Sequence, residues 1–175
     1  MNGLQRYPCV LAVYLNTRGF AFVVFESSLS PVDWGIKETR GPHKNSRCIT
    51  KIERIVDRYR PSVLILQDTS PEGTRRTRRI RDLNEDIVEL AAIREIPACA
   101  YSRADVLNAF SEFGVETKHD LALVIAQHIP AFERYLPRPR KPWMSEDARM
   151  GLFDAAALAL TFFQSAGGEN REPPE

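Results

Sequence analysis

Cysteine and histidine are scarce in this sequence, with three residues of each among 175. Cys9, Cys48 and Cys99 are far apart and set among apolar neighbours, and their odd number excludes a complete disulfide framework. The sequence has neither a CxxC pair nor the paired histidine spacing that is typical of a zinc site. We therefore interpret the cysteines as buried thiols in a reducing compartment.

Long apolar runs and a strong net charge are also missing. The longest apolar stretch, at residues 10–14, is too short to span a bilayer, and the N-terminus lacks the pattern of a signal peptide. We therefore expect a soluble cytoplasmic protein with no membrane partner. The net charge is only +1, so recognition of a nucleic acid would depend on local basic clusters.

The chain length suits a single domain, which we place at residues 1–166. A domain of this size can bury enough apolar surface to fold without a covalent or metal staple. Residues 167–175 are small, polar and proline-rich, and we predict that they form a disordered tail.

The N-terminal part of the chain predicts three antiparallel strands. Residues 10–13 and 20–25 are continuously apolar and flank the turn residues 16–19, which indicates a hairpin buried on both faces. Residues 32–37 alternate apolar and polar side chains, as a half-exposed strand does.

Helices and strands then alternate in the prediction. Helical spacing of apolar residues in 45–59 and 83–91 precedes the short apolar strands 63–66 and 98–101. Capping-box spacing at Ser102 and at Thr117 predicts two more helices. A proline-rich connector leads to a last helix that we expect to begin at Ser145.

Three segments resemble RuvC-type Holliday junction resolvases of the ribonuclease H-like superfamily: the hairpin at 10–25, the strand at 62–68 and the closing helix at 153–160. The resemblance implies an α/β fold with a mixed five-stranded sheet, in which three antiparallel strands are followed by parallel strands and helices flank the sheet. It also implies a magnesium-dependent endonuclease of DNA recombination that acts as a homodimer on branched DNA.

The catalytic carboxylates of this family match the sequence only in part. Asp154 falls on a magnesium ligand, whereas the first-strand aspartate falls on Tyr14. The aspartate one helical turn before Asp154 falls on Gly151. The fourth-strand glutamate falls on Leu66 or Gln67. The set is therefore degenerate at most of its positions.

Asp68 and Asp154 remain as candidate catalytic residues and Mg²⁺ ligands, with Asp147 as a more distant ligand about two helical turns before Asp154 and Glu146 beside it. A two-metal nuclease needs several carboxylates around two cations about 4 Å apart, so we expect weak or absent cleavage. A structural alternative is that Asp154 is paired with an arginine such as Arg149 or accepts backbone hydrogen bonds, since an unpaired buried carboxylate costs several kcal/mol.

Two basic clusters could contact a nucleic acid. The first cluster follows the fourth predicted strand and consists of Arg75, Arg76, Arg78, Arg79 and Arg81. The second cluster precedes the last helix and consists of Arg138, Arg140, Lys141 and Trp143. Arginines would bind phosphates and Trp143 could stack on an unpaired base, although it could equally pack at the start of the last helix. The first cluster lacks the lysine and spacing of a P-loop, so no nucleotide cofactor is expected.

Two functions therefore remain open. The chain either binds branched or structured DNA or RNA, or serves as a noncatalytic protein-interaction module that retains the fold.

Overall fold

The computed structural model describes residues 9–70 and 76–169. Five strands form one sheet in the order β3-β2-β1-β4-β5. They are β1 (Val10–Asn16), β2 (Gly19–Ser27), β3 (Ser30–Glu38), β4 (Val63–Gln67) and β5 (Ala98–Tyr101). The pairs from β3 to β1 are antiparallel and those from β1 to β5 are parallel, as predicted.

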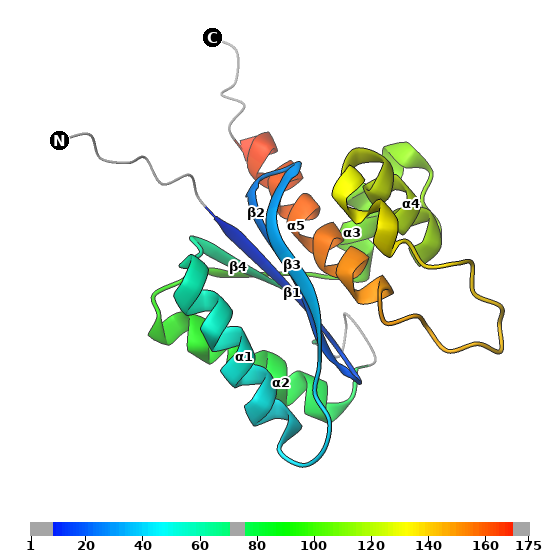
Figure 1. Cartoon of the computed structure of the whole chain (residues 1–175). Helices are drawn as coiled ribbons and strands as arrows, with labels where there is room; N and C mark the ends of the chain where they lie inside the picture. The colour runs from blue at the N-terminus through cyan, green and yellow to red at the C-terminus, as the bar shows by residue number, and fades with distance from the viewer. Residues whose placement is uncertain (1–8, 71–75, 170–175) are drawn as a thin grey trace, which may run out of the picture.

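Helices cover both faces of this sheet (Figure 1). One face carries α1 (Lys44–Tyr59) and α2 (Arg78–Ile93). The other face carries α3 (Arg103–Ala109), α4 (Lys118–His128) and α5 (Met150–Glu169), with the short 3-10 helices η1 (Ser111–Phe113) and η2 (Pro130–Tyr135). This mixed sheet between two helical layers is the ribonuclease H-like architecture that we predicted.

The alternation of side chains along each strand divides the interior into two cores. Leu11, Val13 and Leu64 belong to the core under α1 and α2. Ala12, Tyr14 and Ile65 belong to the core under α5. Side chains in a strand alternate between the two faces of the sheet. Each residue near the end of β1 or β4 therefore points either toward α1 and α2 or toward α5.

Both predicted capping boxes are present. Ser102 caps α3 and Thr117 caps α4, and in each case the carboxylate of the aspartate at the third helical position accepts a hydrogen bond from the backbone N–H of the capping residue. The box at Thr117 makes Lys118 the first residue of α4. Local sequence therefore fixes where the Lys118 side chain leaves the helix.

The last helix begins later than we predicted. It starts at Met150 rather than at Ser145. Its first turn has hydrogen bonds that span three residues, in which the N–H groups of Met150 and Gly151 donate to the carbonyls of Asp147 and Ala148. The segment before it is exposed at Ser145 and lacks the apolar contacts that would hold another helical turn. The helix continues to Glu169, beyond the tail boundary that we expected at residue 167.

The cysteines differ in burial. Cys48 is buried, whereas Cys9 and Cys99 are partly exposed, and all three are free thiols. The prediction of three buried thiols was therefore correct only for Cys48. Within the described ranges, no helix is long and apolar enough to cross a membrane.

Candidate functional site

Asp154 lies on the inner face of α5, with only 9% of its surface exposed. Met150 and Gly151 lie one helical turn before it, and Ala157 and Leu158 lie one turn after it. Burial raises the pKa of its carboxyl group from 3.8 to about 6, although the neighbouring Lys118 ammonium opposes this shift. The carboxylate form is therefore costly here and depends on its cationic neighbour.

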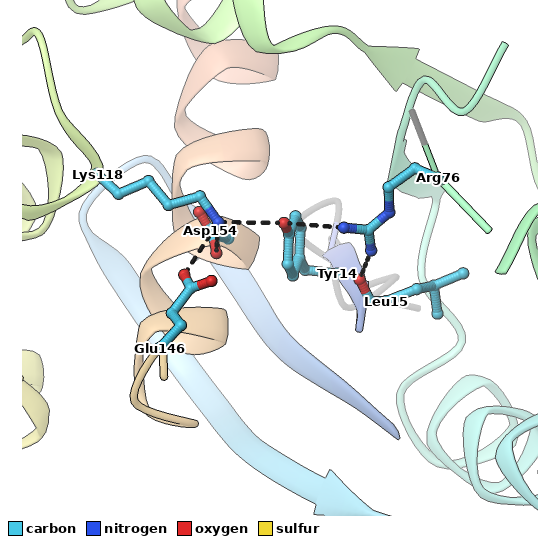
Figure 2. A network of polar contacts seen from close by, with 6 residues as sticks. All are labelled: Tyr14, Leu15, Arg76, Lys118, Glu146 and Asp154. Carbon is cyan, nitrogen blue, oxygen red and sulfur yellow. Dashed lines mark hydrogen bonds and ion pairs between the residues drawn. The ribbon is translucent and has the colours of Figure 1, made fainter. Parts of the chain in front are cut away.

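Lys118 is that neighbour (Figure 2). Its Nζ lies 3.3 Å from Oδ2 of Asp154 and 3.0 Å from Oε1 of Glu146. Burial disfavours the charged form of the lysine and by itself would lower its pKa. The attraction of the Asp154 and Glu146 carboxylates is stronger, so the pKa of Lys118 is raised. The ammonium also sits in the first turn of α4, where the helix dipole disfavours a cation. The two carboxylates compensate both costs.

Tyr14 projects from β1 between two cations (Figure 2). Lys118 Nζ donates a long hydrogen bond of 3.4 Å to its hydroxyl, and Arg76 donates one of 3.5 Å from the other side. The ring itself lies 5.3 Å from the Arg76 guanidinium carbon and 5.4 Å from Lys118 Nζ, within the range of cation-π contacts. Arg76 also donates to the backbone carbonyl of Leu15.

Gly151 brings the first turn of α5 close to the β1–β2 hairpin. A β-carbon at this position would lie 3.3 Å from the Ala21 β-carbon and 3.3 Å from Asn16 Nδ2. Any larger side chain would require the hairpin or the helix to shift by a few tenths of an ångström. Gly151 thus permits tight packing at the position where the family has an aspartate.

Gln67 and Asp68, at the end of β4, point to opposite faces of the sheet. Gln67 lines the same cavity as Tyr14 and Asp154, and its Oε1 is buried with no hydrogen-bond partner. Asp68 instead lines a hollow beside α2 with Arg78 and accepts a hydrogen bond from the Ser70 backbone. The structure therefore brings Gln67, and not Asp68, into the cavity of Asp154, as strand alternation requires.

Asp147 is engaged by a different cation. Its carboxylate accepts two hydrogen bonds from the Arg149 side chain, at 3.0 and 2.7 Å. These bonds hold the pKa of Asp147 below its usual range. The structural alternative from the sequence named the wrong partner, because Arg149 pairs with Asp147 while Asp154 pairs with Lys118.

These residues do not fit a pair of magnesium ions. Magnesium prefers several oxygen ligands in near-octahedral geometry. Among its described residues, the wall of the cavity offers only one carboxylate, beside tyrosine, serine and threonine side chains, the Gln67 amide and an ammonium group in contact with that carboxylate. Nowhere in residues 9–70 and 76–169 do three or more histidine, cysteine or acidic side chains cluster as metal ligands.

The first basic cluster divides into two groups. Arg76 turns into the site, and Arg79 donates to Asn45 and to the backbone carbonyl of Asn16. Arg78 and Arg81 line the hollow beside Asp68. Arg75 lies outside the described residues. The cluster is therefore not one uniform phosphate-binding surface.

The second cluster lies in the connector between η2 and α5. Trp143 is 78% exposed, and Lys141 Nζ lies 5.3 Å from the centre of its ring. Arg138 and Arg140 are exposed as well. The structure contradicts the alternative in which Trp143 packs at the start of the last helix, since that role requires burial.

Lys118 is the site residue that sequence reasoning missed. It comes from a segment that carries no family motif, whereas Glu146 stands beside the candidate Asp147 in the sequence. The capping box before Lys118 was visible, but it gives no indication that the next lysine reaches a carboxylate 36 positions further along the chain. A lysine in a first helical turn, where the dipole disfavours it, was the available signal.

The chain has a RuvC-like fold in which the Lys118 ammonium balances the charge of the Asp154 carboxylate. The structure of Thermus thermophilus RuvC in complex with Holliday junction substrate has a TM-score of 0.67 and 17% identity, and the match covers 95% of this chain and 99% of that one. Another Thermus thermophilus RuvC structure has the same TM-score and coverage at 16% identity.

The yeast mitochondrial Holliday junction resolvase Ydc2 matches with a TM-score of 0.57 and 14% identity, over 97% of this chain and 84% of that one. No family model and no curated protein matches the chain. The predicted RuvC-like, ribonuclease H-like fold is thus confirmed.

Proposed function

We propose that this protein binds structured nucleic acid, such as branched DNA, through a RuvC-like fold, and that it does not cleave by the two-metal route. The observation that carries this proposal is the contact of 3.3 Å between the Lys118 ammonium and the Asp154 carboxylate. A cation supplied by the chain balances the charge that the resemblance would assign to a metal ion. The Mg²⁺ that the resemblance implied is therefore not required.

The groove over this pair supports binding of a phosphate. It has a volume of about 240 Å³ and lies between the β1–β2 turn and the start of α5. Arg18, Arg76 and Lys118 line it together with the carboxylates of Glu146, Asp147 and Asp154. Lys118 and Arg149 pair with these acids. Arg18 and Arg76 form no ion pair with an acid among the described residues and could contact a phosphate, which gives affinity without reading sequence.

Other parts of the prediction extend this proposal. Arg78, Arg81, Arg138, Arg140 and Lys141 remain proposed phosphate contacts, and Trp143 is exposed enough to stack on an unpaired base. A homodimer is proposed on the resemblance alone, and light scattering measures it directly. The free thiols agree with a cytoplasmic location.

The test compares binding and cleavage on one substrate. A labelled four-way DNA junction is titrated with protein in EDTA and in Mg²⁺, and the same mixtures are analysed for strand cleavage in Mg²⁺ and in Mn²⁺. We expect salt-sensitive binding of similar strength with and without metal, and no cleavage. Metal-dependent cleavage that Asp154→Asn abolishes would refute the noncatalytic proposal. Absence of binding at low salt would favour the protein-interaction module.

A further inference from the structure

A second basic surface continues from the groove, in a part of the chain where no basic cluster was predicted. A hollow of about 360 Å³ and a neighbouring one of about 500 Å³ lie between the β1–β2 turn, the end of β3 and α1. They share Arg40, and the first also shares Arg18 with the groove. We call their cations the basic track: Arg18, Arg40, Lys44, Arg47, Lys51 and Arg54.

Backbone carbonyls, and not carboxylates, hold three of these cations in place. Arg47 donates to the carbonyl of Arg40 at 2.7 Å, and Lys51 donates to that of Glu38 at 3.0 Å. Lys44 donates to the carbonyl of Thr17. A carbonyl oxygen orients a cation without cancelling its charge, so these side chains are preorganised and still positive.

The charges of α1 are divided between two faces. Arg47, Lys51 and Arg54 follow a helical spacing that puts them on the face of the track. Glu53 and Asp57 face α2 instead, where Arg94 pairs with both at 2.7 and 2.5 Å. Among the described residues that line the two hollows, Glu38 is the only acid, and it pairs with the exposed Arg40.

The length of the track suits a nucleic-acid backbone. Lys44 and Arg54 are separated by about 15 Å of helix rise. One strand of a duplex carries about four phosphates over that length. The track opens into the groove of the candidate site at Arg18, so a duplex arm could run from the groove along α1.

We propose that the basic track binds the phosphate backbone of a nucleic-acid duplex arm whose end lies in the groove above Lys118. This inference rests on the proposed function and specifies which surface performs it. An acidic protein is the competing partner, but it would not require cations spaced along one continuous path from the groove.

The experiment measures junction affinity against salt concentration for matched triple variants. Arg18→Gln with Arg47→Gln and Lys51→Gln removes three charges from the track. Arg60→Gln with Arg94→Gln and Arg134→Gln removes three charges elsewhere. We expect the track variant to bind at least about tenfold more weakly at low salt, and the slope of log affinity against log salt to fall by about two to three. The control should keep its slope.

A second pair of variants separates binding from folding. Arg18→Glu with Arg54→Glu leaves the three hydrogen bonds to backbone carbonyls intact, and Arg60→Glu with Arg134→Glu is its control. Equal losses in track and control variants would overturn the track while leaving the proposed function in place. Absence of binding by the unaltered protein would overturn both. Competition by polyglutamate as effective as that by duplex DNA at equal charge would identify the track as a surface for acidic protein.

Discussion

The ammonium of Lys118 and the carboxylate of Asp154 form a contact of 3.3 Å between the first turn of α4 and the inner face of α5. Glu146 and the Tyr14 hydroxyl complete the surroundings of the ammonium, so the pair belongs to a network rather than to an isolated bridge. Its energetic weight comes mainly from the burial of the aspartate, because a carboxylate left alone in an apolar helix face is expensive.

Removal of the lysine should therefore destabilise the fold. We expect Lys118→Met to reduce the free energy of unfolding by about 2–3 kcal/mol, since Asp154 would lose its closest cation. Urea denaturation at pH 7 measures this loss. The double variant with Asp154→Leu should recover much of it, because no unpaired charge remains. Additive losses in the two single variants would show that the pair is not coupled.

The pH dependence of stability gives an independent measure of Asp154. Its pKa is about 6 in the folded chain and 3.8 when unperturbed. The folded state therefore holds this proton more tightly, and the stabilising contribution is complete below pH 3.8 and is lost as the pH rises through about 6.

We expect the stability of Asp154→Asn relative to the unaltered protein to increase between pH 4 and pH 7, by at most about 3 kcal/mol. Urea denaturation of both proteins across this interval measures the difference. A constant difference would mean that the carboxyl titrates normally in the folded state.

Replacement of Tyr14 by an acid tests the fit to metal directly. Tyr14→Asp adds a second carboxylate beside Asp154 and removes the ring that Lys118 and Arg76 contact. We expect this variant to be less stable in EDTA than in Mg²⁺, because a bound cation would stabilise only the folded state. Thermal unfolding in both solutions measures the effect. Tyr14→Phe is the matched control, and its unfolding temperature should be the same in EDTA and in Mg²⁺.

Trp143 should contribute to binding and not to folding. We expect Trp143→Ala to weaken junction binding by about 1–3 kcal/mol, the usual range for a stacked base, and to change unfolding by less than about 0.5 kcal/mol. Fluorescence anisotropy and urea denaturation measure the two quantities. Met144→Ala, at an exposed neighbouring position, is the control. Unchanged affinity would remove Trp143 from the interface.

The order of strands and helices could be predicted because hydrophobic periodicity and capping residues are local signals. The hairpin of β1 and β2 and the boxes at Ser102 and Thr117 are examples. The start of α5 could not be predicted as well, since Ser145 has the chemistry of a cap but no apolar partner that holds a helical turn beside it. Boundaries of that kind depend on tertiary contacts.

The site was predictable only in outline. Strand parity could have favoured Gln67 over Asp68, because Gln67 ends β4 on the same face as Ile65 and the next residue points to the opposite face. The partner of Asp154 could not be derived, since the long reach from Lys118 depends on how α4 packs against α5. The basic track was missed for the same reason: its arginines and lysines come from a turn, a strand end and a helix that only the fold brings together.

A side-chain ammonium differs from a bound ion in that it is covalently tethered and cannot exchange with solution. The capping box at Thr117 sets the start of the helix from which Lys118 projects, so the counter-charge for Asp154 is installed as soon as α4 and α5 pack together. The cation that balances Asp154 is thus encoded in the amino-acid sequence itself.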